Sequence, residues 1–175
     1  MSNRVIPIRR RVGLTLLAGC CAAGLFGTVA AYALPEDSEQ PIHMRADNAE
    51  GDLTGTTILT GDVRMDQGTM RVEGDTMTIE QEDDKVVRIT TEGDLAHYTQ
   101  QLHAGDAFVK ADAEVIIYHA REEFVEFRGR AFLTQDNNEF RGHVIVYDMK
   151  AGKVDATSNE EGPVRMIWQP ATKSD

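Results

Sequence analysis

Histidine is the side chain best suited to metal binding and acid–base catalysis, yet the histidines of this 175-residue chain are spaced for neither. The five are His43, His97, His103, His119 and His143. They form no His-x-His pair, no His-Glu-x-x-His motif and no cluster with cysteine. We therefore interpret them as surface or hydrogen-bonded histidines, and we expect no metal site and no cofactor.

Serine and carboxylate side chains give equally little support for catalysis. The three serines after residue 33, Ser38, Ser158 and Ser174, lie outside any nucleophile elbow. Carboxylates are plentiful, and a pair such as Glu73 with Glu80 has the residue type that glycosidases use. Both acids occupy polar positions of an alternating segment, where a solvated sheet face is the simpler interpretation. The sequence indicates no enzyme, and a carbohydrate-active β-protein is the enzymatic alternative.

What dominates the chain from Pro41 onward is an alternation of apolar and polar side chains with a period of two. This period is typical of β-strands that bury one face, and no helical stripe exceeds two turns. Turn residues separate the alternating runs at 52–55, 67–68, 82–84, 105–106, 121–122, 136–138 and 151–152. The predicted strands are 42–45, 57–60, 62–66, 69–73, 76–81, 86–91, 96–99, 107–110, 114–119, 124–128, 131–134, 139–141, 143–148 and 164–168.

One two-run pattern occurs twice. Gly61 and Gly74 frame the first copy, and Gly129 and Gly142 frame the second at the same spacing. Each copy reads as a hairpin that cannot bury its apolar face alone. A repeat of this kind indicates a stacked, antiparallel all-β architecture such as a sandwich, a jelly roll or an open roll.

The first 33 residues read as a cleaved signal peptide. Four arginines between positions 4 and 11 precede an apolar run over 12–30, and residues 31–33 supply a small-x-small cleavage site. We expect the exported chain to begin at Leu34, with 34–40 as a flexible leader. A membrane anchor and a lipoprotein modified at Cys20 are the alternatives. The lack of a second apolar span argues against the anchor, and the apolar run after Cys20 argues against lipidation.

Export changes both the cysteine content and the charge. Cys20 and Cys21 are the only cysteines, so the exported chain has no disulfide. The first 33 residues hold four of the 18 basic residues and none of the 29 acidic ones, which leaves a net charge of −15. This charge excludes nucleic acid as a partner, because phosphate recognition needs clustered lysine and arginine. It also argues against docking on an anionic membrane.

Several strings resemble the OstA-like family of periplasmic lipopolysaccharide-transport proteins. They are residues 40–44, 59–63, 67–72, 124–133 and 142–147, which follow the order of the family from about residue 40 to residue 156. The resemblance implies a domain over 41–170, followed by a tail over 171–175. The implied fold is an open, twisted β-jelly roll of antiparallel strands with an apolar interior groove.

The resemblance also implies a function. Members of the family hold the acyl chains of lipopolysaccharide in the groove and stack end to end. The stack joins an inner-membrane transport complex to an outer-membrane translocon, for outer-membrane assembly in Gram-negative bacteria. We expect the same ligand, partners and periplasmic location here. The alternative is a periplasmic scaffold or chaperone that uses its free strand edges and carries no lipid.

The family match and the alternation together predict which residues line the groove. Ile117 and Tyr118 conflict, because adjacent residues of a regular strand face opposite sides, and only a bulge would let both face the groove. The predicted lining residues are Ile42 and Met44 at the entrance edge, Val63, Met65, Val72, Met77, Ile79, Ile117, Phe127, Leu133, Val144 and Val146 along the body, and Tyr98 and Tyr118 by alignment with the family.

Overall fold

The computed structural model describes residues 37–52, 55–101, 106–159 and 162–169. All of them belong to one compact unit. The predicted signal peptide, residues 34–36 of the predicted leader and the predicted tail lie outside the described residues. Within the described ranges, no helix is long and apolar enough to cross a membrane.

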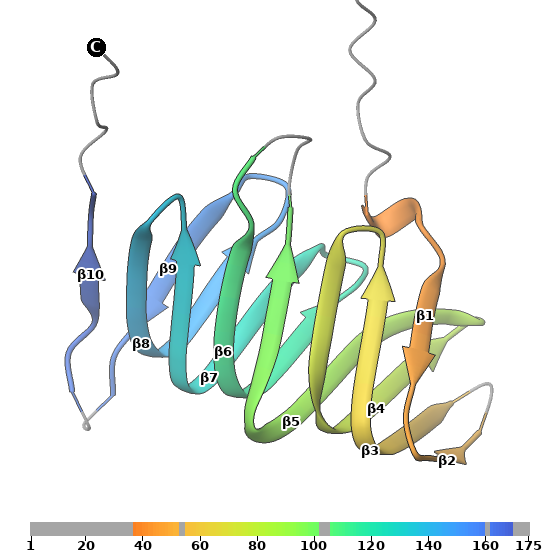
Figure 1. Ribbon diagram of the computed structural model, residues 1–175. Coiled ribbons are helices and arrows are strands. Elements are labelled where there is room, and N and C mark those ends of the chain that lie inside the picture. Colours follow the sequence, from red (N-terminus) through yellow and green to blue (C-terminus); the bar gives the residue numbers. More distant parts are fainter. Residues whose placement is uncertain (1–36, 53–54, 102–105, 160–161, 170–175) are drawn as a thin grey trace, which may run out of the picture. The chain divides into compact units, whose positions relative to one another are not determined.

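The described residues form a single antiparallel sheet of ten strands (Figure 1). The strand order is β1-β3-β4-β5-β6-β7-β8-β10, with β2 also beside β3 and β9 also beside β8. The all-β prediction is confirmed. The elements are η1 (Asp37–Glu39), β1 (Ile42–Arg45), β2 (Asn48–Gly51), β3 (Thr56–Gln67), β4 (Met70–Glu82), β5 (Lys85–Gln100), β6 (Val109–His119), β7 (Phe124–Gln135), β8 (Asn138–Asp148), β9 (Lys153–Thr157) and β10 (Arg165–Ile167).

Pairs of predicted short strands are merged into long ones. The predicted strands 57–60 and 62–66 both belong to β3, and the same merging produces β4 to β8. The strands β2 and β9 were not predicted. The last four residues of the predicted flexible leader, 37–40, also differ from expectation, because they contain the short helix η1.

The long strands merge because the sheet bends at the expected breaks without losing its pairing. Each central strand pair has a register shift close to its middle, and a bulge at such a position bends and twists the strand. The shifts lie between Thr60 and Val63, Glu73 and Thr76, Glu92 and Ala96, Asp112 and Val115, and Arg128 and Ala131. These positions lie on neighbouring strands, so the sheet folds along one line.

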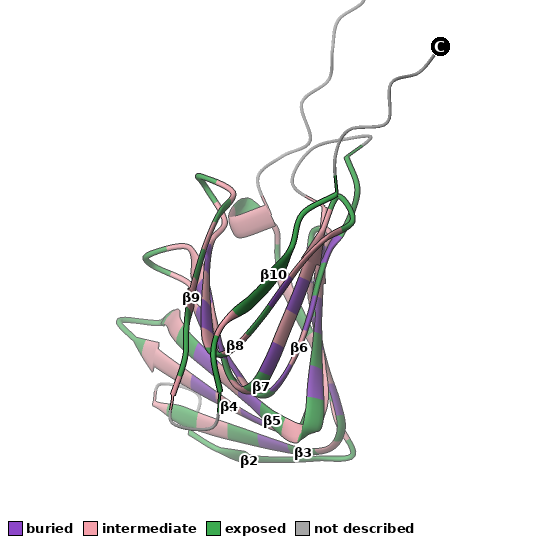
Figure 2. Ribbon diagram, turned by 90° about the vertical axis from the view of Figure 1, so that its left-hand side faces the viewer, coloured by how far each residue is buried: buried purple, intermediate pink, exposed green. Residues whose placement is uncertain are grey.

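The fold line divides the sheet into two layers, which diverge from the bend toward the hairpin turns (Figure 2). Layer A consists of β1, β10 and residues 63–67, 70–74, 96–100, 109–113, 131–135 and 138–142. Layer B consists of β2, β9 and residues 56–60, 76–82, 85–92, 115–119, 124–128 and 144–148.

Glycine makes the bend possible in both copies of the sequence repeat. Gly61 has a φ of 81° and Gly129 has a φ of 74°, and each is followed by a second left-handed residue, Asp62 or Arg130. A β-carbon on Gly129 would collide with the carboxylate of Glu114. The repeat is thus a pair of equivalent hairpins, β3–β4 and β7–β8, which bend at equivalent positions.

Replacing Gly129 by alanine tests the bend. We expect Gly129→Ala to lower the free energy of unfolding by about 1–2 kcal/mol, because an L-residue is strained at positive φ and the new methyl group meets Glu114. Gly55→Ala is the matched control, since the nearest atom to its β-carbon, Asp52 Cβ, would lie 3.8 Å away. Urea denaturation measures both variants, and equal stability of the two would contradict this account of the bend.

Candidate functional site

The facing surfaces of the two layers form one continuous apolar interior. Its side chains come from every strand from β3 to β8, and Met65, Met77, Phe127 and Leu133 are completely buried. Figure 2 shows buried segments on both layers. Hydrocarbon surface of this extent is the dominant source of stability for the fold.

Aromatic side chains connect the layers across this interior. The ring of Tyr98 on layer A meets the ring of Phe127 on layer B edge-on, with centroids 5.3 Å apart. Tyr98 also contacts Tyr147 on layer B, at a centroid distance of 6.5 Å. The space between the layers is therefore filled by the protein's own side chains at this point.

The apolar interior continues to both ends of the sheet, where it becomes partly exposed. Ile42 and Met44 of β1 are half-buried against one end of the core, and Val154 and Ala156 of β9 are half-buried against the other. Beyond β8 on layer A, Met166 of β10 is 57% exposed. The interior is thus an apolar strip that runs the length of the sheet and opens at each end.

Most of the predicted lining residues face this interior. Ile42 and Met44 lie at its β1 end, and nine other predicted residues are buried within it. Contact of these residues with a lipid remains a prediction. The predicted residues on the interior face are Ile42, Met44, Val63, Met65, Val72, Met77, Ile79, Tyr98, Tyr118, Phe127 and Leu133.

The prediction is wrong for Ile117, Val144 and Val146, which face the outside of layer B. Their neighbours Tyr118 and Ile145 are the buried, inward-facing residues. Ile117 is only 8% exposed, but it lies opposite Thr90 and Glu126 on the outer face. The physical reason is that residues 115–118 and 144–147 are apolar on both faces of their strands, so the alternation does not tell which face is inward. The conflict between Ile117 and Tyr118 is resolved in favour of Tyr118.

Several interior residues were also missed. On β8 the inward residues are Phe140 before the bend and Ile145 and Tyr147 after it. On β6 they are Ala111 and Ala113 before the bend and Ile116 after it. Alternation alone could not have identified Ile116, Ile145 and Tyr147, because their neighbours on the opposite face are equally apolar.

A ring of polar side chains lies at the open rim of the interior. Gln67 and Gln100 are each only 4% exposed. The Tyr98 hydroxyl donates to Gln100 Oε1 at 2.6 Å, and the Tyr118 hydroxyl donates to Gln67 Oε1 at 3.2 Å. The hydroxyl of Tyr147 is buried and has no hydrogen-bond partner among the described residues.

Burial keeps these tyrosine hydroxyls protonated. It raises the pKa of Tyr118 to about 12, with a smaller contribution from the negative charge of Asp37. Burial also raises the pKa of Tyr98 well above its ordinary value, and Tyr147 and Asp37 add to the shift. The rim therefore presents neutral hydroxyl and amide groups above a hydrocarbon interior.

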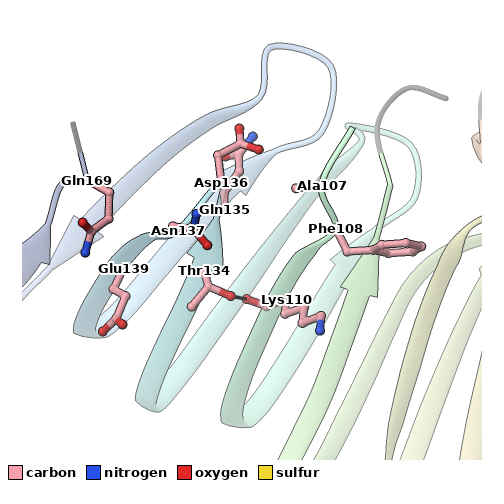
Figure 3. Close-up of a pocket in the computed structure, with 9 residues that line it drawn as sticks. All are labelled: Ala107, Phe108, Lys110, Thr134, Gln135, Asp136, Asn137, Glu139 and Gln169. Carbon is pink, nitrogen blue, oxygen red and sulfur yellow. Dashed lines mark hydrogen bonds between the residues drawn. The ribbon is translucent and has the colours of Figure 1, made fainter. Parts of the chain in front are cut away.

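The outer face of layer A has a separate concavity of about 690 Å³ near the turn between β7 and β8 (Figure 3). Lys110, Thr134 and Glu139 line it from adjacent strands, together with Asp136 and Asn137 of the turn. Apart from Ala107 and Phe108, the lining residues are polar or charged, so the concavity differs in character from the apolar strip.

The acidic residues considered for catalysis are not brought together. Glu73 lies on layer A, 3.8 Å from Arg64, and Glu80 lies on layer B, paired with Arg88. The bend separates them. Within the described ranges, no three His, Cys, Asp or Glu side chains are grouped as metal ligands would be.

Comparison with known proteins places this architecture in a family. Residues 43–153 match the family described as "LptA/(LptD N-terminal domain) LPS transport protein". The chain belongs to this family. The resemblance to OstA-like proteins seen in the sequence is thereby confirmed.

Named relatives of the LptA family are similar in sequence to this chain over most of its length. The lipopolysaccharide export system protein LptH of Pseudomonas aeruginosa is 32% identical over 170 residues, which cover 92% of this chain and 96% of that protein. The lipopolysaccharide export system protein LptA of Escherichia coli K12 is 29% identical over 155 residues, or 86% and 83% of the two chains.

A solved structure of the LptA family supports the fold. The crystal structure of LptH from Pseudomonas aeruginosa, described as the LptA-homologous periplasmic component of the lipopolysaccharide transport device, matches with a TM-score of 0.72. The match is 32% identical and covers 78% of this chain and 100% of that one. The open β-jelly roll expected from the sequence is thus confirmed.

Adjacent residues of β8 test the corrected assignment of faces. We expect Ile145→Asp to cost about 4 kcal/mol or more, because the side chain is fully buried and a charge placed there has no partner. Val144→Asp should cost less than about 1 kcal/mol, because Val144 is half-buried on the outer face opposite Arg128. Urea denaturation of both variants measures the difference, and a greater loss at Val144 would reverse the assignment.

Proposed function

We propose that this chain is a periplasmic lipopolysaccharide-binding transport protein that passes its ligand along the apolar strip. In this proposal, copies joined end to end bridge an inner-membrane transport complex and an outer-membrane translocon. The observation that carries the proposal is the strip itself, which is continuous between the layers and half-exposed at both ends. Membership of the LptA family supports the identity of the ligand.

Affinity for the ligand would come from burial of its acyl chains. With a net charge of −15 after residue 33, the protein repels an anionic lipid at long range. Each methylene group sheltered from water contributes about 0.8 kcal/mol, so a lipid with several chains can outweigh this repulsion. Apolar burial has no preferred direction, and a chain can therefore move between neighbouring positions of the strip at little cost.

Acyl chains can enter only if the layers move apart, because the protein's own side chains meet between them. The layers share their backbone pairing along the bend and contact each other elsewhere through side chains. Separation of the rims therefore needs no break in strand pairing. Met65, Met70 and Met77 favour such rearrangement, because unbranched methionine side chains adapt to different neighbours.

End-to-end assembly would use the edge strands. In the described part of the sheet, β1 and β2 pair only with β3, and β9 and β10 pair only with β8. Each end therefore has two strands with one free edge, and a free edge can add a strand from another chain. Joining the β1–β2 end of one copy to the β9–β10 end of the next would make the apolar strip continuous between copies.

The periplasmic location in this proposal depends on removal of residues 1–33 as a signal peptide. The n-region, the apolar run and the cleavage site support export. Relatives in the LptA family include LptH of Pseudomonas aeruginosa, which is described as a periplasmic component of the lipopolysaccharide transport device. Analysis of the N-terminus of the exported protein would locate the cleavage site.

Two aromatic residues of β7 provide a matched test of lipid binding. We expect a benzoyl-phenylalanine crosslinker at Phe127 to form adducts with lipopolysaccharide in cells, because Phe127 is fully buried in the interior. The same crosslinker at Phe132, on the outer face beneath Arg141, should form none. Immunoblotting for lipopolysaccharide on the purified protein detects the adducts. Protein adducts alone at both positions would favour the scaffold or chaperone function instead.

Adjacent residues of β10 test the end-to-end joint. Met166, opposite Phe140, faces the end of the apolar strip, and Ile167 faces outward. We expect Met166→Glu to weaken self-association at least tenfold, because it removes apolar contact, and tenfold corresponds to about 1.4 kcal/mol. Both residues are about half exposed or more, so the fold should survive.

Sedimentation velocity over a range of concentrations measures the association. Ile167→Glu is the control, because it adds the same charge to the same strand on the opposite face. Equal weakening of self-association by both variants would mean that the contact between copies does not make the apolar strip continuous from one copy to the next. A wild-type protein that stays monomeric throughout would contradict assembly.

A further inference from the structure

The segment just before β1 is hydrogen-bonded to polar side chains at the rim of the apolar interior. The carboxylate of Asp37 accepts hydrogen bonds from the backbone N–H of Thr69 at 2.7 Å, the Thr69 hydroxyl at 2.6 Å and Gln100 Nε2 at 2.8 Å. In Figure 1 this segment is the orange helix beside the turn between β3 and β4. Residues 37–40, named here the strap, are thereby attached to layer A.

The same strap is bonded to the second glutamine of the rim. Gln67 Nε2 donates to the carbonyl oxygens of Ser38 at 3.3 Å and Gln40 at 3.1 Å. Gln67 Oε1 in turn accepts the hydroxyl of Tyr118, which belongs to layer B. The bonds therefore run from the strap through Gln67 to Tyr118, and from Asp37 through Gln100 to Tyr98.

The turn between β3 and β4 is shaped to receive the strap. Gly68 adopts a φ of 58°, and a β-carbon there would collide with the carboxylate of Asp37. Asp37 also lies close enough to both rim tyrosines for its charge to act on them. These contacts give the strap a specific position at the rim, although the sequence suggested a flexible leader.

We propose that the strap closes the mouth of the interior and occupies the position where the polar linkages of an amphipathic lipid bind. This inference rests on the proposed function and names a second part of the same site. Acyl chains would enter the apolar strip, and their ester, amide and hydroxyl groups would take over the hydrogen bonds of Gln67 and Gln100.

The polar groups of the rim can form the same kinds of hydrogen bond with the lipid as with the strap. Each glutamine amide offers both donors and acceptors, and the two tyrosines offer neutral hydroxyls. A buried amide left without a partner is costly, so water or the polar groups of the lipid must take the place of the strap when it leaves. The buried, unpartnered hydroxyl of Tyr147 provides one further donor for the incoming lipid.

The negative charge of Asp37 makes the strap and an anionic lipid compete for the mouth. The carboxylate holds the strap through three hydrogen bonds, and it would repel the phosphate of an anionic lipid at the same mouth. The two occupants therefore exclude each other. Competition of this kind lowers the apparent affinity for lipid by the fraction of molecules in which the mouth is open.

Hydrogen–deuterium exchange with purified Escherichia coli lipopolysaccharide tests the displacement. On addition of the lipid, we expect exchange to become faster in peptides that contain residues 37–40 and Thr69, whose amide is bonded to Asp37. Peptides from the strand interiors, such as 125–133, should become slower at the same time. Slower exchange in both regions would overturn the strap proposal, because the strap would then stay closed over bound lipid.

Asp37→Ala tests the competition directly. We expect its apparent affinity for lipopolysaccharide to increase about tenfold, because loss of the carboxylate bonds raises the fraction of open molecules. Glu39→Gln is the control, since Glu39 is exposed in the same helix and its affinity should equal that of the wild type. Unchanged affinity in Asp37→Ala would overturn the strap proposal, and absence of lipid binding in all three proteins would overturn the proposed function itself.

Discussion

The structure depends on one constraint: a single sheet must bury the same face on both sides of a fold line. Every central strand crosses that line and stays paired with its neighbours on either side of it. A regular strand alternates its side chains with a period of two. The strand must therefore change its twist or its phase at the fold line to keep apolar residues inward. Left-handed glycines such as Gly61 and Gly129 make this change sterically possible.

The fold line also determines where the protein is open. A closed barrel has no edges, whereas this folded sheet has free strands at both ends and a rim opposite the bend. The ends expose apolar residues in a row, as Met44 and Val154 show. The rim has instead Gln67, Gln100 and the hydroxyls of Tyr98 and Tyr118. Apolar contact is thus offered along the length of the molecule, and polar contact along its mouth.

The sequence pattern predicted much of this and failed at identifiable places. Alternation located the hairpins. It also identified interior residues of β3, β4 and β7 correctly, because every lining residue predicted on these strands faces inward. It failed on β6 and β8 because residues 115–118 and 144–147 are apolar on both faces, and it therefore placed Ile117 and Val144 on the wrong face. It missed β2 because all four of its residues are exposed. The role of Asp37 depends on contacts with residues about 32 and 63 positions away, which no local pattern reports.

These two kinds of contact suit the two demands that the proposed function would make on the protein. The strip must hold hydrocarbon without fixing it, and apolar surface with methionine side chains holds it without directional bonds. The rim must keep the polar part of the ligand oriented, and hydrogen bonds to Gln67 and Gln100 are directional. If both functions were combined in the interior, buried polar groups there would trap each lipid at one position. In the proposed function, confining the polar groups to the rim, with the strap as their alternative partner, would let one lipid be oriented while its chains remain free to move along the strip.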